Sequence, residues 1–261
     1  TSPFAFTGNK FEFRMLGSSF SVSGPNFVLN TIIADKLSQF ADQLEKETDF
    51  ACALSKLVKE TYQKHRRIVF NGNNYAQAWV EEAQRRGLSN LKSTVDALPT
   101  FISKKSIALF SKFGVLSETE IHSRYEIVLE NYCKTINIEA LTMTDMVRKQ
   151  ILPALSAFSG ELARSAQDKL TLVPSLSLSY EKSTVASLSR LSDSLEAAVT
   201  ELEKRVVDAR MVGEVLQAGR YYHDQVLPAM AEVRSISDSA ELLMGETYYP
   251  IPTYEQLLYS V

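Results

Sequence analysis

Three charged side chains of different chemistry occupy alternate positions near the start of the chain. They are Lys10, Glu12 and Arg14. Every second side chain of an extended strand points to the same face, so a strand here would place all three on one surface. Glutamate offers hard oxygen ligands to a divalent cation such as Mg²⁺, while lysine and arginine bind phosphate oxygens. The triplet therefore suits a site that holds a metal and a phosphate together.

The residues between these charges predict the strand itself. Phe11, Phe13 and Met15 are apolar and alternate with the three charged residues over the stretch Asn9 to Met15. This alternation is the period of a half-buried strand. On spacing alone, an exposed strand face with cross-strand ion pairs is the preferred interpretation. A metal-and-phosphate site needs a further, independent argument.

Beyond this strand the apolar residues recur at helical spacing. Pro25 suits the first turn of a helix that we expect to extend to about Glu47. Further helices are predicted over Ala51 to Ile68, Tyr75 to Arg86, Lys104 to Phe113, Glu118 to Lys169, Tyr180 to Arg210 and Gly213 to Met244. The predicted fold class is mainly α, a helical bundle with long helices preceded by a short strand segment.

Two patterns describe the long helices more closely. A series of apolar residues in steps of three and four comprises Val185, Leu188, Leu191, Leu195, Val199, Leu202 and Val206. This spacing is typical of a bundle or coiled-coil seam. The similar segments Gln150 to Ala154 and Gln225 to Ala229 each place a proline inside a helical pattern. Because proline removes a backbone donor and clashes with the preceding turn, both helices should kink or restart there.

Composition indicates a globular chain and disfavours two kinds of partner. Hydrophobic residues make up 45% and charged residues 23%, values near those of soluble globular proteins. The net charge of −3 argues against nucleic acid, so the basic runs at Lys64 to Arg67, Arg85–Arg86 and Lys104–Lys105 are interpreted as solvated surface. A membrane is not expected as a partner either, since no run of 18 or more apolar residues occurs.

Cysteine and histidine spacing predicts neither a disulfide framework nor a metal cluster. Cys52 and Cys133 lie far apart among apolar neighbours, and both are predicted to be small core residues. The three histidines, His65, His122 and His223, fall in separate helical segments and are given structural or surface roles. The chain contains no Asn-x-Ser/Thr acceptor and no secretory pattern, so the cytoplasm is the expected compartment.

The chain also lacks the common signatures of a self-contained catalytic site. It contains no GxxxxGK[ST], GxGxxG or GxSxG motif. A complete enzyme within these residues is therefore not expected, and the Lys10, Glu12, Arg14 strand is the main candidate site.

The independent argument for that site is a resemblance. The stretch Gly8 to Arg14 and the helix start Ser23 to Asn26 resemble the late strand motif of glutamine synthetases. The resemblance implies that Glu12 is a metal ligand for Mg²⁺ or Mn²⁺. It implies that Arg14 is a catalytic residue that contacts the transferred phosphoryl group and the glutamate substrate. It also places Lys10 near the ATP phosphates, although arginine is usual at that position.

Further segments resemble only the type III branch of this family. They are Ile68 to Tyr75, Asp96 to Pro99, Asn137 to Thr142 and Tyr249 to Tyr254. The resemblance thus divides the chain into residues 1–48, the end of an upstream α+β catalytic domain, and residues 49–261, the helical C-terminal region of the type III branch. The family's remaining metal carboxylates, its metal-binding histidine and its N-terminal domain are expected upstream.

The resemblance implies ATP-dependent ligation of ammonia to glutamate through a γ-glutamyl phosphate, in a ring-shaped homo-oligomer. The chain by itself is expected to be inactive, because most of that site is absent from it. Two alternatives stay open at this stage. The helices could form a structural or oligomerisation module with no catalytic role, or the chain could be a helical adaptor unrelated to ligases.

Overall fold

The computed structural model describes residues 4–6, 11–13, 20–73 and 75–259. The chain divides into two compact units, one of Thr1–Lys92 with Asp96–Ser123 and the other of Ser93–Val95 with Arg124–Val261. Helices dominate both, so the prediction of a mainly helical fold is confirmed.

The first unit begins with a two-stranded antiparallel sheet. Strand β1 (Phe4–Phe6) pairs with β2 (Phe11–Phe13), and Phe4 lies opposite Phe13. The elements that follow are α1 (Ser23–Leu44), α2 (Phe50–His65), η1 (Arg66–Ile68), α3 (Gln77–Arg85), α4 (Thr94–Ala97), η2 (Leu98–Thr100) and α5 (Lys104–Lys112). Helix α4 lies at the boundary between the two units. Helices α1, α2, α3 and α5 start and end close to the predicted ranges, whereas α4 and η2 form where no helix was predicted.

Aromatic and aliphatic side chains pack α1 against α5 in this unit. Phe110 of α5 is 2% exposed, and the centroids of its ring and the Phe27 ring of α1 are 5.8 Å apart. The Phe101 ring also contacts the Phe110 ring, with 5.8 Å between the centroids. Phe110, Leu116 and Ile121 are the buried residues of this cluster. An ion pair between Lys112 and Asp35, with 2.8 Å between nitrogen and oxygen, closes the edge of this contact.

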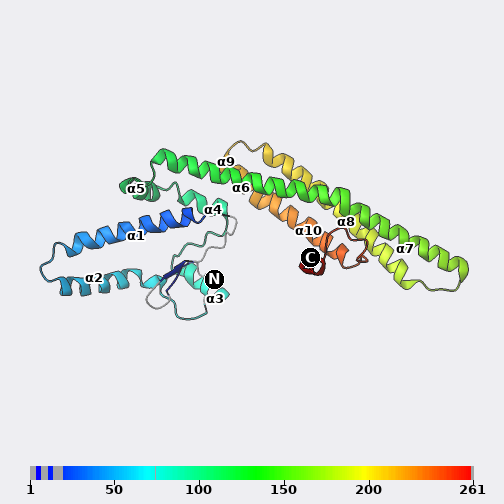
Figure 1. Cartoon of the computed structure of the whole chain (residues 1–261), viewed down its shortest axis with the longest axis horizontal. Coiled ribbons are helices and arrows are strands. Elements are labelled where there is room, and N and C mark those ends of the chain that lie inside the picture. Colours follow the sequence, from blue (N-terminus) through cyan, green and yellow to red (C-terminus); the bar gives the residue numbers. More distant parts are fainter. Residues whose placement is uncertain (1–3, 7–10, 14–19, 74, 260–261) are drawn as a thin grey trace. The chain divides into compact units, whose positions relative to one another are not determined.

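The second unit is a bundle of long helices (Figure 1). Its elements are most of α6 (Glu118–Met146), then η3 (Val147–Ile151), α7 (Leu152–Leu172), α8 (Ser179–Arg210), α9 (Val215–Tyr221), η4 (Tyr222–Val226), α10 (Leu227–Glu241) and α11 (Tyr254–Tyr259). Helix α8 returns alongside α7 and also packs against α10. The central helix therefore contributes a buried seam to both neighbours.

That seam follows the predicted spacing. Leu188, Leu195, Val199 and Leu202 are fully buried, and Val206 is 2% exposed. Steps of three and four keep these residues on one stripe of the helix, where they meet apolar residues of α6, α7 and α10. Burying one such side chain contributes roughly 1.5 to 3 kcal/mol relative to leaving it in water.

Both prolines that interrupt a helical pattern are preceded by a π-helical turn. In η3 the Leu152 N–H donates to the Val147 carbonyl, and in η4 the Leu227 N–H donates to the Tyr222 carbonyl. Each bond spans five residues, and each turn ends just before the Leu–Pro pair. The wider turn accommodates a residue that cannot donate a helical hydrogen bond, so the predicted change in each helix takes the form of a π-helical turn, and the chain stays helical through the proline.

Candidate functional site

The strand that carries Glu12 forms where the sequence predicts it. Glu12 is the central residue of β2, and its backbone lies opposite Ala5 of β1. Lys10 and Arg14 lie outside the described residues, and so does the Glu12 side chain. The shared face of Lys10, Glu12 and Arg14 therefore stays a prediction from strand periodicity.

The three histidines fall in separate helical elements. His65 ends α2, His122 lies in α6, and His223 lies in η4, where its Nδ1 is 2.7 Å from an Asp224 carboxylate oxygen. Within the residues that the structure describes, no three His, Cys, Asp or Glu side chains converge on a metal-sized space.

One cysteine prediction was wrong and the other holds in part. Cys52 is exposed, because no residue of its helix α2 is buried. Cys133 is half-buried against the core of the second unit, and burial raises the pKa of its thiol.

Loop 66–71 of the first unit is held to α3 by Arg86. Its guanidinium donates to the carbonyls of Val69 at 2.9 Å and Arg67 at 3.2 Å, and it pairs with Glu82. Arg85 and then Arg86 lower the pKa of Glu82 to about 2. These contacts make the basic residues parts of a surface loop and helix end, in keeping with the interpretation made from the sequence.

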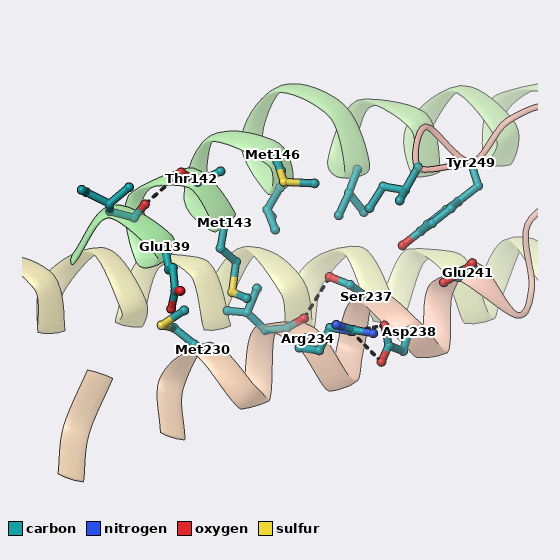
Figure 2. A pocket seen from close by; sticks show the side chains of 15 residues that line it. Glu139, Thr142, Met143, Met146, Met230, Arg234, Ser237, Asp238, Glu241 and Tyr249 are labelled. Atoms are coloured by element: carbon teal, nitrogen blue, oxygen red, sulfur yellow. Dashed lines mark hydrogen bonds and ion pairs between the residues drawn. The ribbon is translucent and has the colours of Figure 1, made fainter. Parts of the chain in front are cut away.

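A cavity in the second unit has a volume of about 570 Å³ (Figure 2). Its walls come from α6, η3, α10 and the segment that follows α10. The lining residues with apolar side chains are Ile138, Met143, Met146, Val147, Ile151, Met230, Val233, Tyr249 and Ile251. Val147 and Ile151 are the two ends of the π-helical turn, and such turns are frequent at functional sites.

Polar side chains surround the same cavity. The Arg234 guanidinium donates from Nε to both Asp238 carboxylate oxygens, at 2.6 and 2.9 Å. The buried Ser237 hydroxyl donates to the Val233 carbonyl at 2.9 Å. Burial, followed by the negative charges of Glu241 and Asp238, raises the pKa of Tyr249 to about 12. The phenol is therefore protonated at neutral pH and can both donate and accept a hydrogen bond.

The sequence analysis did not find this cavity. Its lining residues come from segments roughly a hundred positions apart, and their spacing matches no site motif. The Gln-x-Leu-Pro-Ala segment at residues 150–154 was the available signal, since it includes Ile151 and overlaps the end of the π-helical turn.

The helices were also compared with the length and hydropathy that a membrane span requires. Within the part of the chain that the structure describes, each helix is too short or too polar to span a bilayer.

The helical fold and the family comparison together define the class. Residues 53–169 match the family model described as the glutamine synthetase C-terminal domain. The resemblance to glutamine synthetases that the strand motif and the helical segments indicated is thus confirmed.

The relatives narrow the class to a branch. The chain is 40% identical over its full length to a glutamine synthetase of Butyrivibrio fibrisolvens, covering 37% of that protein. It is 37% identical over 99% of its length to a type-3 glutamine synthetase of Dictyostelium discoideum, covering 36% of it. A glutamine synthetase of Bacteroides fragilis is 28% identical across the whole chain. The chain spans a little over a third of the length of these relatives.

Proposed function

We propose that this chain is the C-terminal part of a type III glutamine synthetase, which joins ammonia to glutamate through a γ-glutamyl phosphate at the expense of ATP. The observation that carries the proposal is the 40% identity along the entire chain to a glutamine synthetase. The strand at Phe11–Phe13 supports it, because the motif residue Glu12 lies in an extended segment as the family motif requires.

In this proposal three residues of the first strand act on the substrates. Glu12 would bind one divalent metal, Mg²⁺ or Mn²⁺, through its carboxylate oxygens. Arg14 would contact the transferred phosphoryl group and the glutamate substrate, where a planar guanidinium can bind two oxygens at once. Lys10 would lie near the ATP phosphates as a single positive charge. These roles follow from the family motif and from strand periodicity.

The residues present fit a shared metal site but not a complete one. Glu12 supplies hard oxygen, which suits Mg²⁺ and Mn²⁺, yet such ions take about six oxygen ligands. Among the described residues no cluster of carboxylates or histidines could supply the others. The remaining ligands would come from protein segments outside this chain and from water. A bound metal would neutralise phosphate charge during phosphoryl transfer.

The proposal assigns different tasks to the two parts of the chain. Residues 1–48 would complete the catalytic domain, and residues 49–261 would form the helical region of the type III branch. The helices would act as a scaffold, in a homo-oligomer in the cytoplasm. A reducing compartment suits Cys52 and Cys133, which are both free thiols.

The test uses the full-length protein with Glu12→Gln and Arg14→Lys. The first change removes the metal-binding charge, so activity should fall and should partly recover at higher metal concentration. The second keeps the charge but removes bidentate geometry, so kcat should fall about a hundredfold with no recovery by metal. If the residues form only a cross-strand ion pair, both variants would keep near-normal kcat and lose at most about 1 kcal/mol of stability.

A second candidate function is subunit contact through α2. Four apolar side chains recur every fourth residue on this helix, and their exposed fractions are 60% for Phe50, 40% for Leu54, 61% for Val58 and 59% for Tyr62. A stripe of this kind marks an interaction surface. If α2 makes a contact between subunits, Val58→Glu should lower the mass of the full-length assembly in analytical ultracentrifugation. Lys59→Glu, on a neighbouring exposed position, is the matched control.

A further inference from the structure

The cavity of the second unit has an apolar interior that suits an organic ligand. Its volume of about 570 Å³ falls in the range of small-molecule sites, roughly 300 to 1,000 Å³. Met143, Met146 and Met230 project into it from α6 and α10 (Figure 2). Methionine side chains are flexible and polarisable, so they adapt to apolar groups of different shape.

The charged groups around the cavity are mainly negative. Three carboxylates, those of Glu139, Asp238 and Glu241, contribute to its lining, against one guanidinium, that of Arg234. Their formal charges sum to −2. Asp238 also binds the guanidinium directly, so Glu139 and Glu241 supply the excess negative charge.

Two hydroxyls at the cavity, those of Ser237 and Thr142, already donate their protons to backbone carbonyls and can still accept a hydrogen bond. The Ser237 side chain is 95% buried and already donates its proton to a backbone carbonyl, which leaves its oxygen to accept. Thr142 donates to the Ile138 carbonyl in the same way, at 2.8 Å. Figure 2 shows the Tyr249 ring extending from the segment after α10 towards that helix, and the carboxylates of Glu241 and Asp238 act on its phenol. A ligand should therefore bring donors and positive charge.

From this arrangement we propose that the cavity binds an apolar primary amine, with the alkyl or aryl part among the three methionines and the ammonium at Glu241, Ser237 and Tyr249. The ammonium offers three donors and no acceptor, which matches the acceptors around the cavity. An anion of the same size would face the excess carboxylates, and a neutral alcohol would lose the charge-assisted hydrogen bonds. This site is separate from the Glu12 strand and does not depend on the proposed ligase activity.

The test titrates the chain with dansylcadaverine, an aromatic group that ends in a primary ammonium and whose fluorescence reports transfer to an apolar site. Two matched probes carry the same dansyl group with an N-acetylated amine or a carboxylate at the end. The ammonium probe should give a saturable emission increase, and the two others should bind at least about tenfold more weakly. Equal affinity for the three probes, or no saturable change with the amine up to about 1 mM, would overturn the proposal.

Two substitutions locate the binding. Glu241→Gln should lower the affinity for the ammonium probe about tenfold and leave the affinity for the acetylated probe unchanged. Glu232→Gln, on the same helix but outside the cavity, should change the affinity for neither probe. Met230→Trp should fill the cavity and remove binding of all probes, with circular dichroism to check folding. Met143→Phe is the substitute should Met230→Trp fail to fold. Unchanged amine binding by Glu241→Gln, or by a folded cavity-filling variant, would contradict the assignment.

Discussion

Arg148, in the π-helical turn η3, donates from Nη2 to a carboxylate oxygen of Glu203 on α8 at 2.9 Å, across 55 residues of sequence. The same guanidinium binds Glu203 through Nε at 3.1 Å, contacts the Glu196 carboxylate and donates to the Thr200 hydroxyl at 3.0 Å. Through the Arg148 side chain, the π-helical turn η3 is thus bound to two successive turns of α8. Hydrogen bonds from Arg148 lower the pKa of Glu203 below its ordinary value of 4.5.

This ion pair predicts a pH-dependent contribution to stability. A carboxyl group whose pKa is lowered by folding stabilises the protein above its unfolded pKa, and that contribution disappears as pH falls through the folded value. Glu203→Gln should cost about 0.5 to 1 kcal/mol at pH 7, a value reduced for solvent screening because 41% of the Glu203 side chain is exposed.

Urea unfolding of the chain at several pH values measures this effect. The difference between wild type and Glu203→Gln should be largest near pH 7 and should shrink below pH 4.5. Glu130→Gln, in an exposed pair with Lys134 on α6, is the control and should have a smaller effect. A difference that does not vary with pH would show that the Arg148 contact contributes through packing alone.

The seam of α8 predicts a large difference between two leucine truncations. Leu195 is fully buried in the bundle, whereas Leu172 at the end of α7 is 84% exposed. Leu195→Ala should lower the free energy of unfolding by about 2 to 5 kcal/mol, because it removes apolar contact and leaves a cavity. Leu172→Ala should change it by less than about 0.5 kcal/mol. If denaturant titrations gave similar losses of unfolding free energy for both variants, the burial of Leu195 in the bundle would be contradicted.

Two helical glycines predict opposite effects of the same substitution. A Cβ at Gly219 in α9 would lie 2.9 Å from Cγ1 of the buried Val95, while a Cβ at Gly160 in α7 would meet nothing within 4 Å. Gly160→Ala should stabilise the chain by about 0.5 to 1 kcal/mol, because alanine loses less backbone entropy in a helix. Gly219→Ala should destabilise it by about 1 to 3 kcal/mol through overpacking.

Thermal melts of these two variants, measured side by side, test the packing of α9 in the second unit. If Gly219→Ala raised the melting temperature as much as Gly160→Ala, the close contact with Val95 would be wrong.

The division of the catalytic site predicts that the chain by itself makes no glutamine. In the proposed function Glu12 would supply one of the several ligands that a divalent metal requires, so the purified chain should bind Mg²⁺ weakly. Coupled assay of ADP release with glutamate and ammonia should give no turnover above buffer. Measurable glutamine formation by the purified chain would contradict the shared-site proposal.

Local pattern was sufficient to predict much of the fold. Steps of three and four from Val185 to Val206 place the apolar residues on one side of a helix, because helical periodicity is a property of neighbouring residues. The strand at Phe11–Phe13 follows from alternation in the same way. The prolines at 153 and 228 marked the positions where both helices change, since a missing backbone donor has a local effect.

Tertiary structure decided what depends on distant partners. The exposure of Cys52 follows from the lack of buried residues on α2, which no local pattern reveals. The cavity joins Met143 on α6 with Met230 on α10 and Tyr249 beyond it, residues that come together only when the helices pack around α8. Periodicity identifies which face of a helix is apolar, but the element that covers that face, and the space left between them, are set by long-range packing.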